Sequence, residues 1–217
     1  MKRTHFLILA LIFGASIVGA SKASAETIDG TNSADVQING SVGKLDNTDP
    51  TTNIPEGSDE WINVTVDTTT AFHTTTASSH KTIASADYSI ANNSGRAVAV
   101  TLSQMAGTPK YVETLAVNVK GTNLIATPSA TNLVASNALV DLSSAPVWLR
   151  LANKDGRFNI SSDTQNQYGN AAEFYYTGQT VANLPADVNQ TATAENYTLT
   201  LKFASIQADG TTVGVPQ

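Results

Sequence analysis

The sequence predicts an all-β fold, an antiparallel β-sandwich of Ig-like or jelly-roll-like type with roughly nine or ten strands. Apolar residues recur at every second position, with few stripes of helical spacing, which indicates strands that bury one face. Val, Ile, Thr and Tyr dominate these runs, and only 14% of the residues are charged. Such a composition is typical of a half-buried pleated surface. Gly, Asn and Pro separate the runs and mark turns.

The first 25 residues have the features of a secretory signal peptide, which are a positive start, an apolar run and a small-x-small cleavage site. These features are Lys2 with Arg3, the run from Phe6 to Val18, and Ala23-Ser24-Ala25. We expect the mature protein to begin near Glu26 and to be secreted, remaining extracellular or associated with the cell wall. No later run reaches the roughly 18 apolar residues of a membrane-spanning helix. A protein that does not span the membrane is therefore predicted.

Residues 26–217 are long enough for one all-β domain with its own core. The chain has no Cys, so we expect the core alone to hold the fold, as in exports of Gram-positive bacteria rather than in disulfide-rich animal modules. The formal net charge of −6 and the few, scattered Lys and Arg argue against a nucleic-acid partner. The oligomeric state stays open.

Four segments alternate apolar and polar side chains clearly enough to be predicted as strands. They are residues 61–67, 97–103, 113–120 and 196–206. The last is the clearest, because Tyr197, Leu199, Leu201 and Phe203 share one face while Lys202 points away. A Lys that faces outward argues against a Lys-to-Asn or Lys-to-Asp isopeptide bond in this strand.

A hairpin is predicted where residues 147–152 and 157–161 flank Asn153-Lys154-Asp155-Gly156, because Asp-Gly supplies the positive φ of a tight turn. Weaker alternation predicts four further strands. They are residues 34–42, 87–91, 138–142 and 173–177. Segments rich in Pro, Thr, Ser and Asn predict long loops near residues 45–59, 68–80 and 181–194.

Residue types that carry catalysis or bind metals are few. His73 and His80 lie in a Thr/Ser-rich segment without a Cys, whereas zinc needs three or four rigid ligands. No nucleophile elbow, phosphate loop or zinc-protease motif is present. We therefore predict neither an enzyme nor a cofactor nor a metal site. Asp46, Asn47 and Asp49 offer oxygen ligands for calcium, but Asx-turns with solvated carboxylates explain this cluster equally well.

The predicted binding residues are Trp148, Arg150 and Trp61. Alternation places Trp61 on the polar face of its strand, and it places Trp148 beside Arg150 on the face opposite Val147, Leu149 and Leu151. An exposed indole next to polar groups can stack on a sugar or anchor a protein partner. The alternative is that a neighbouring loop covers each ring, or that both faces of these strands are partly buried.

Three segments resemble WxL-domain proteins, which coat the walls of low-GC Gram-positive bacteria non-covalently. The closing strand with its approach, Ala192 to Leu201, is similar to that of the family, as are the acidic Pro-containing loop Asp46 to Pro50 and the strand-turn-strand segment Asp87 to Arg96. The chain departs from the two Trp-x-Leu triplets that name the family. Leu199 stands where the closing Trp would be, and Trp148 and Leu149 are adjacent.

These observations favour a secreted, non-catalytic, WxL-like protein with a binding or structural role at the cell surface or cell wall. Its partner would be a cell-wall polymer or another surface protein. The first alternative is a subunit that assembles by strand addition into a fibre or surface complex, because a sandwich leaves strand edges available. The second alternative is a secreted hydrolase, since a glycosidase needs only two opposed carboxylates, which a sequence alone does not reveal.

Overall fold

The structure is a computed structural model that describes residues 45–126 and 129–211. The predicted signal peptide, the start near Glu26 and the predicted strand at residues 34–42 lie outside the described residues. In the part that is described, no helix is both long and apolar enough to cross a membrane.

The described residues contain eleven strands and two short 3₁₀ helices, which loops and turns connect. The strands are β1 (Val64–Val66), β2 (Phe72–Thr74), β3 (Thr82–Ser85), β4 (Tyr88–Asn92), β5 (Val98–Gly107), β6 (Val112–Lys120), β7 (Thr131–Ala135), β8 (Ala138–Leu139), β9 (Val147–Leu151), β10 (Ala171–Thr180) and β11 (Tyr197–Ser205). The helices are η1 (Asp59–Trp61) and η2 (Thr76–Ser78). The prediction of an all-β fold is confirmed.

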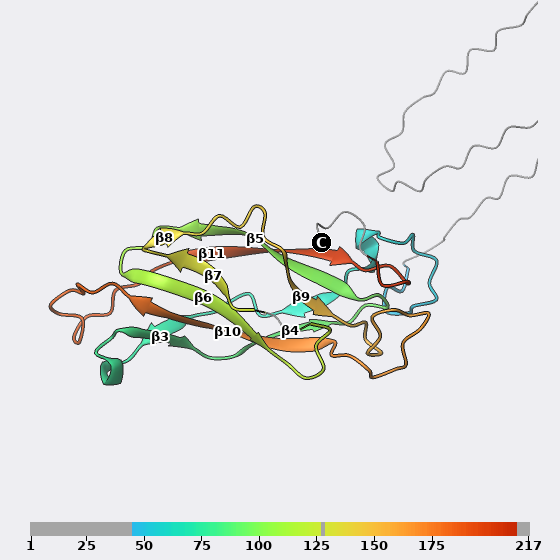
Figure 1. The fold of residues 1–217 in the computed structure, drawn as a ribbon, viewed down its shortest axis with the longest axis horizontal. Helices are drawn as coiled ribbons and strands as arrows, with labels where there is room; N and C mark the ends of the chain where they lie inside the picture. Colours follow the sequence, from blue (N-terminus) through green and yellow to red (C-terminus); the bar gives the residue numbers. More distant parts are fainter. Residues whose placement is uncertain (1–44, 127–128, 212–217) are drawn as a thin grey trace, which may run out of the picture. The chain divides into compact units, whose positions relative to one another are not determined.

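The strands form two antiparallel sheets that pack face to face, as in a β-sandwich (Figure 1). The large sheet has eight strands, with β1, β4, β10, β6, β7 and β8 in that order. One edge of β10 is shared, because its first half pairs with β4 and its second half with β3, beyond which lies β2. The small sheet has three strands in the order β11-β5-β9.

The core lies between the two sheets, where the inward faces of the central strands meet. On β5, Val98, Val100 and Leu102 have no exposed surface, and neither has Val117 on β6. These are the inward residues that alternation predicts. Burying each such side chain contributes roughly 1.5–3 kcal/mol, so the central strands supply much of the stability.

Most of the predicted strands are present. The structure has strands at five of the predicted ranges, with bounds that differ by a few residues. Residues 97–103, 113–120, 196–206, 87–91 and 173–177 overlap β5, β6, β11, β4 and β10, respectively. Two predictions are too long, because only Val64–Val66 of residues 61–67 and only Ala138–Leu139 of residues 138–142 are strands. Strands β2, β3 and β7 were not predicted. The predicted loop at residues 68–80 contains β2 and η2, whereas residues 181–194 contain no strand.

The predicted hairpin after β9 is wrong in its second half. The turn is present: Gly156 has a φ of 76°, and its N–H donates to Asn153 O at 2.9 Å. Residues 157–161, however, form turns rather than a strand. The Asp163 carboxylate accepts hydrogen bonds from the N–H groups of Phe158 and Asn159, at 2.9 and 2.7 Å. This local pairing competes with a sheet ladder.

Candidate functional site

Trp61 is not an exposed binding residue, and the prediction that its ring faces solvent is wrong. Its exposed fraction is 0%. Period-two alternation does not apply at this position, because Trp61 ends η1, which Ser58 caps by accepting a hydrogen bond from Glu60 N–H at 3.2 Å. The guanidinium carbon of Arg96 lies 4.1 Å from the ring centroid of Trp61. A cation over an indole face is attractive, so the ring belongs to a structural contact.

Trp148 is also buried, with 7% of its surface exposed, and the prediction that it shares an exposed face with Arg150 is wrong. The reason is a β-bulge in the pairing of β9 with β5. Leu149 pairs with Val100 and Val147 with Thr101, which leaves Trp148 as the extra residue. A bulge re-aims a side chain. Here the Trp148 ring packs edge-on against Phe174, at 6.1 Å between centroids, while Arg150 stays half-exposed.

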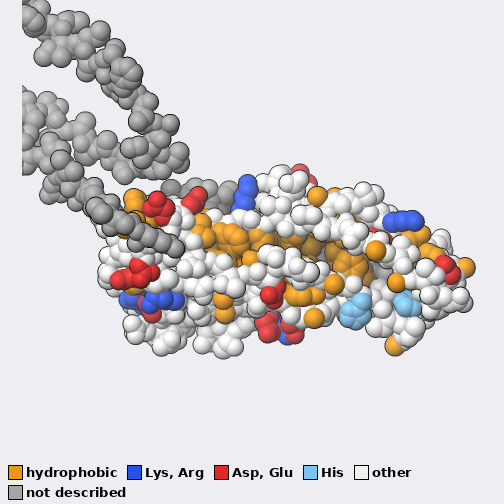
Figure 2. Space-filling model, turned by 180° about the vertical axis from the view of Figure 1, so that it is seen from behind, with side chains coloured by type: hydrophobic (Ala, Val, Ile, Leu, Met, Phe, Trp, Pro, Cys, Tyr) orange, Lys and Arg blue, Asp and Glu red, His pale blue; other side chains and the backbone are white. Residues whose placement is uncertain are grey.

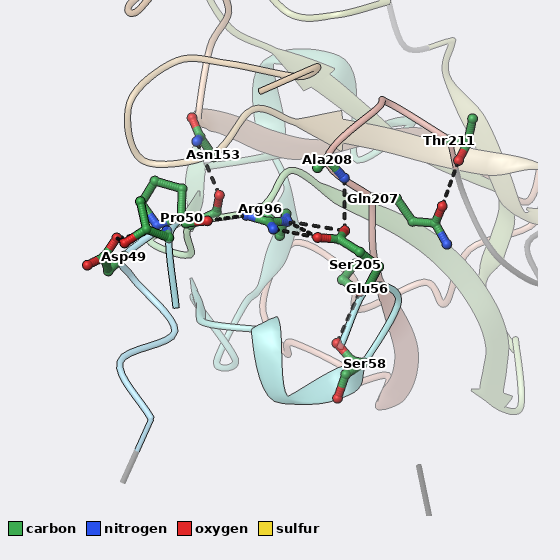
Figure 3. Close-up of polar contacts among 12 residues, drawn as sticks. Asp49, Pro50, Glu56, Ser58, Arg96, Asn153, Ser205, Gln207, Ala208 and Thr211 are labelled. Carbon is green, nitrogen blue, oxygen red and sulfur yellow. Dashed lines mark hydrogen bonds and ion pairs between the residues drawn. The ribbon is translucent and has the colours of Figure 1, made fainter. Parts of the chain in front are cut away.

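Arg96 holds the loop of residues 45–59 against the end of the sandwich (Figure 3). Its Nη2 lies 2.5 Å from Glu56 Oε1, and its Nη1 donates to Pro50 O at 2.8 Å. The Arg96 side chain is only 8% exposed. We call Arg96, Glu56, Pro50 and Trp61 the Arg96 clamp. A planar guanidinium suits this role, because it binds a carboxylate and a carbonyl while it stacks on the indole.

The clamp ties this loop to the end of β11. Glu56 Oε2 accepts a hydrogen bond from Ala208 N–H at 2.9 Å, and Ser205 Oγ donates to Ser58 O at 3.1 Å. Gly95 lies under the loop, and a Cβ at this position would come within 2.8 Å of Pro50 N. Only glycine permits this approach, so the residue type at position 95 follows from the packing of the loop.

Glu56 makes part of the stability depend on pH. Burial of its carboxylate raises its pKa, but hydrogen bonds from Arg96 and Ala208 and the charge of Arg96 outweigh burial, so the pKa lies below the ordinary value of 4.5. A carboxyl whose pKa is lowered by folding stabilises the fold above its ordinary pKa. This contribution is lost as the pH falls through the lowered value.

We expect Glu56→Gln to lower the Tm at pH 7, because the charged pair with Arg96 is lost. The difference from the unsubstituted protein should shrink below about pH 4.5 and vanish in stronger acid, where Glu56 itself is protonated. Thermal unfolding followed by circular dichroism between pH 2 and 7 measures this difference. The matched control is Glu60→Gln in the adjacent η1, because Glu60 is also exposed but forms no ion pair among the described residues. A Tm difference independent of pH would contradict the assignment.

The acidic residues of the 45–59 loop form Asx-turns, which is one of the two interpretations that their sequence allows. Asp46 Oδ1 accepts hydrogen bonds from the N–H and Oγ1 of Thr48, at 2.9 and 2.7 Å. Asp49 does the same for Thr51, at 2.8 and 2.7 Å. These bonds lower the pKa of both carboxyls. Within residues 45–126 and 129–211, no three His, Cys, Asp or Glu side chains come together as a metal site would require.

The candidate site is a long apolar groove at one side of the sandwich, with a volume of about 1120 Å³. Residues 66–74 line one wall and β11 lines the other, and the loop of residues 184–196 continues the lining. Core side chains form the floor, namely Met105, Leu115, Trp148, Phe174 and Tyr176. We call this the apolar groove. Figure 2 shows it as a band of hydrophobic side chains along the molecule. His73 and His80 also belong to its lining.

Strand β11 exposes its inward face to this groove. Leu199, Leu201 and Phe203 are only half-buried, whereas Val98, Val100 and Leu102 of β5, its partner, have no exposed surface. Among the described strands, β11 pairs with β5 alone. Among residues 45–126 and 129–211, the clearest amphipathic strand of the sequence is therefore an edge strand, and these residues leave a large apolar surface beside it uncovered.

Several polar groups at the groove are engaged within the chain. The Asp67 carboxylate accepts a hydrogen bond from Ser89 N–H at 2.7 Å. The Glu195 carboxylate accepts from the N–H of Tyr111 and from the Tyr197 hydroxyl. Burial and this contact with Glu195 raise the pKa of Tyr197. His80 Nδ1 lies 2.9 Å from Thr74 Oγ1. These contacts hold the walls in place, and the remaining lining is mainly apolar along β11 and the floor and more polar along the loop of residues 184–196.

The sequence predicted the inward face of β11 but not the groove itself. Phe72, which stands in a Thr-rich segment, lies 6.2 Å from Tyr197 between ring centroids across the groove. This lone aromatic residue in a Thr-rich segment is the only sign of the groove in the sequence. Comparisons of the chain with protein-family models, with curated proteins and with solved structures each return no match.

Proposed function

We propose that this chain is a secreted, non-catalytic protein of the cell surface or cell wall that binds another surface protein at the apolar groove. The observation that carries the proposal is the edge of β11, which pairs on one side only among the described strands, beside an apolar face that the described residues leave open. A segment added along such an edge would gain backbone hydrogen bonds from β11 and would place alternate side chains in the groove. The resemblance to WxL-domain proteins supports the location.

The chemistry of the groove favours a protein partner over a wall polymer. Its volume of about 1120 Å³ is above the roughly 300–1,000 Å³ of small-molecule pockets. Its accessible side chains include Phe72, Leu199, Leu201 and Phe203. Such a surface suits the apolar side chains of an extended peptide, whereas a hydroxyl-rich polymer would lose hydrogen bonds with water.

The same edge supports the alternative of a subunit in a fibre or surface complex, with the added strand coming from another subunit. The proposal of a non-catalytic role is supported by the two carboxylates that line the groove. Asp67 and Glu195 both accept hydrogen bonds from backbone N–H groups. A general acid or base needs a proton within reach of substrate, and these carboxylates are instead held by the walls.

The test compares a groove-facing substitution with an outward one on the same strand. Leu199→Gln should weaken retention on isolated cell walls about tenfold or more, because an amide replaces buried apolar surface. The matched control is Thr200→Gln, since Thr200 is exposed and does not line the groove, and its retention should be unchanged. Sedimentation with intact walls and with protease-stripped walls measures both variants. Equal retention on both kinds of wall would indicate a polymer ligand and contradict the proposal.

A further inference from the structure

We propose that residues 34–42 of this same chain fill the apolar groove as an additional strand, parallel to β11. The inference deepens the proposed function. It rests on that function where it concerns binding, because a partner strand that binds at the groove would have to displace residues 34–42. Three observations carry it. They are the edge of β11, the position at which the described chain begins, and the residue pattern of the segment.

The first observation is that the groove has the dimensions of one missing strand. β11 spans nine residues, Tyr197–Ser205, which is about 30 Å of extended chain. Along it, Leu199, Leu201 and Phe203 remain half-buried, and the floor exposes Trp148 and Phe174 to the groove. A strand laid between β11 and residues 66–74 would cover these side chains.

The second observation is where the described chain begins. Asn47 O accepts from Gly95 N–H at 2.7 Å, and Asn63 Nδ2 donates to Asn47 Oδ1 at 3.1 Å. Asn63 directly precedes β1, whose neighbouring residues form a wall of the groove. Ser205, at the end of β11, contacts Ser58 of the same loop. The residues before Leu45 therefore start at the end of the groove where β1 begins and β11 ends.

From that end, the chain's own segment needs only a short connection. Three residue steps separate position 42 from Leu45, and they span at most about 11 Å. An occupant tethered this closely has a high effective concentration, which favours it over the same segment of a second copy. A segment that enters here runs toward this end with increasing residue number. It would therefore be parallel to β11, which also ends here, and antiparallel to β1.

The third observation is the pattern of the segment, Ala34-Asp35-Val36-Gln37-Ile38-Asn39-Gly40-Ser41-Val42. Val36, Ile38 and Val42 fall on one face, and Asp35, Gln37, Asn39 and Ser41 fall on the other. The segment has nine residues, the length of β11. Its apolar face would insert into the groove, and its polar face would continue the outer face of the small sheet, where Thr198, Thr200 and Lys202 are exposed.

Disulfide trapping tests the inference in the full mature chain, which has no Cys of its own. Gln37→Cys is combined in turn with Thr198→Cys, Thr200→Cys and Lys202→Cys, which cover three registers of a parallel pair. Neighbouring strands lie about 4.8 Å apart, within the Cα separation of a disulfide. One of the three pairs should oxidise to a cross-linked monomer, seen by peptide mapping without reductant.

Two controls keep the result specific. Gln104, the partner of Thr200 on β5, lies one strand farther from the groove, so Gln37→Cys with Gln104→Cys should not form the bond. In the cysteine pair that forms the disulfide, adding Ile38→Asp should abolish it, because this substitution places a charge in the groove. Adding Ser41→Asp should leave the disulfide intact. No cross-link in any register, or a cross-link between two copies, would overturn the inference.

The cross-linked double-cysteine variant also distinguishes this inference from the proposed function. With the disulfide closed, residues 34–42 cannot leave the groove, so retention on cell walls should fall at least tenfold and return on reduction. A cross-linked monomer whose wall retention is unaffected would support the inference and overturn the proposed binding at the groove. A missing cross-link, together with loss of retention in Leu199→Gln, would leave the proposed function standing and overturn the inference.

Discussion

Replacing Trp148 with Ala should lower the free energy of unfolding by about 3–5 kcal/mol, the cost typical of removing a core aromatic residue. The ring is 7% exposed and packs edge-on against Phe174. Its removal would enlarge the groove beneath β11, because the ring forms part of the floor. Urea unfolding followed by circular dichroism gives the difference.

Two further variants at β9 show whether packing is the cause. Trp148→Phe should recover most of the stability, because the Trp148 indole N–H has no hydrogen-bond partner among the described residues, and a phenyl ring keeps the aromatic contact. Arg150→Ala should change the stability by about 0.5 kcal/mol or less, as is usual for partly exposed positions. If Trp148→Ala unfolds at the same urea concentration as the unsubstituted protein, the ring lies outside the core.

Asn92→Leu should destabilise the protein by about 3 kcal/mol or more, because it removes the centre of a buried hydrogen-bond network. Asn92 has no exposed surface. Its Nδ2 donates to the carbonyls of Arg96 and Ala152, each at 2.8 Å, and its Oδ1 accepts from Ser94 N–H at 3.1 Å. Leucine has a similar size, but it would leave the Ala152 carbonyl and the Ser94 N–H without this partner, whereas the Arg96 carbonyl keeps a hydrogen bond from Ser94 Oγ at 2.9 Å.

The matched control is Asn132→Leu on β7, where the side chain is exposed. Its stability should stay within about 0.5 kcal/mol of the unsubstituted protein. Calorimetry on both variants measures the difference. Equal losses would show that the network around Asn92 contributes no more than a surface residue, contrary to its burial.

The strands that were predicted correctly are those whose alternation is long and regular. Residues 196–206 alternate over the whole of β11, and one apolar face follows directly from that pattern. β7 was missed because Leu133 and Val134 are consecutive in sequence and both are buried. Its pairing with β6 shifts register between Leu115 and Ala116, so strict alternation is lost. β2 is three residues long, and Phe72 is its only large apolar residue.

The site was harder to predict, because it depends on pairing that a sequence does not encode locally. Alternation shows that Leu199 and Leu201 face inward, but it does not show that β11 lies at an edge. The bulge that turns Trp148 into the core depends on how β9 pairs with β5. The burial of Trp61 depends on Arg96, which is 35 positions away in the chain. Contacts with residues distant in the sequence therefore determine the burial of both Trp side chains, which the local pattern predicted to be exposed.

The Arg96 clamp also sets how the folded body would respond to tension. The first and last described segments meet at one end of the sandwich, where Glu56 contacts Ala208 and Ser58 contacts Ser205. A load between these segments would meet those contacts first. Once they broke, β11 would peel from β5 one hydrogen bond at a time, starting at Ser205, instead of shearing along its whole length. Under a load applied at these two segments, this small polar cluster would thus set the mechanical threshold, while most of the thermal stability comes from the core.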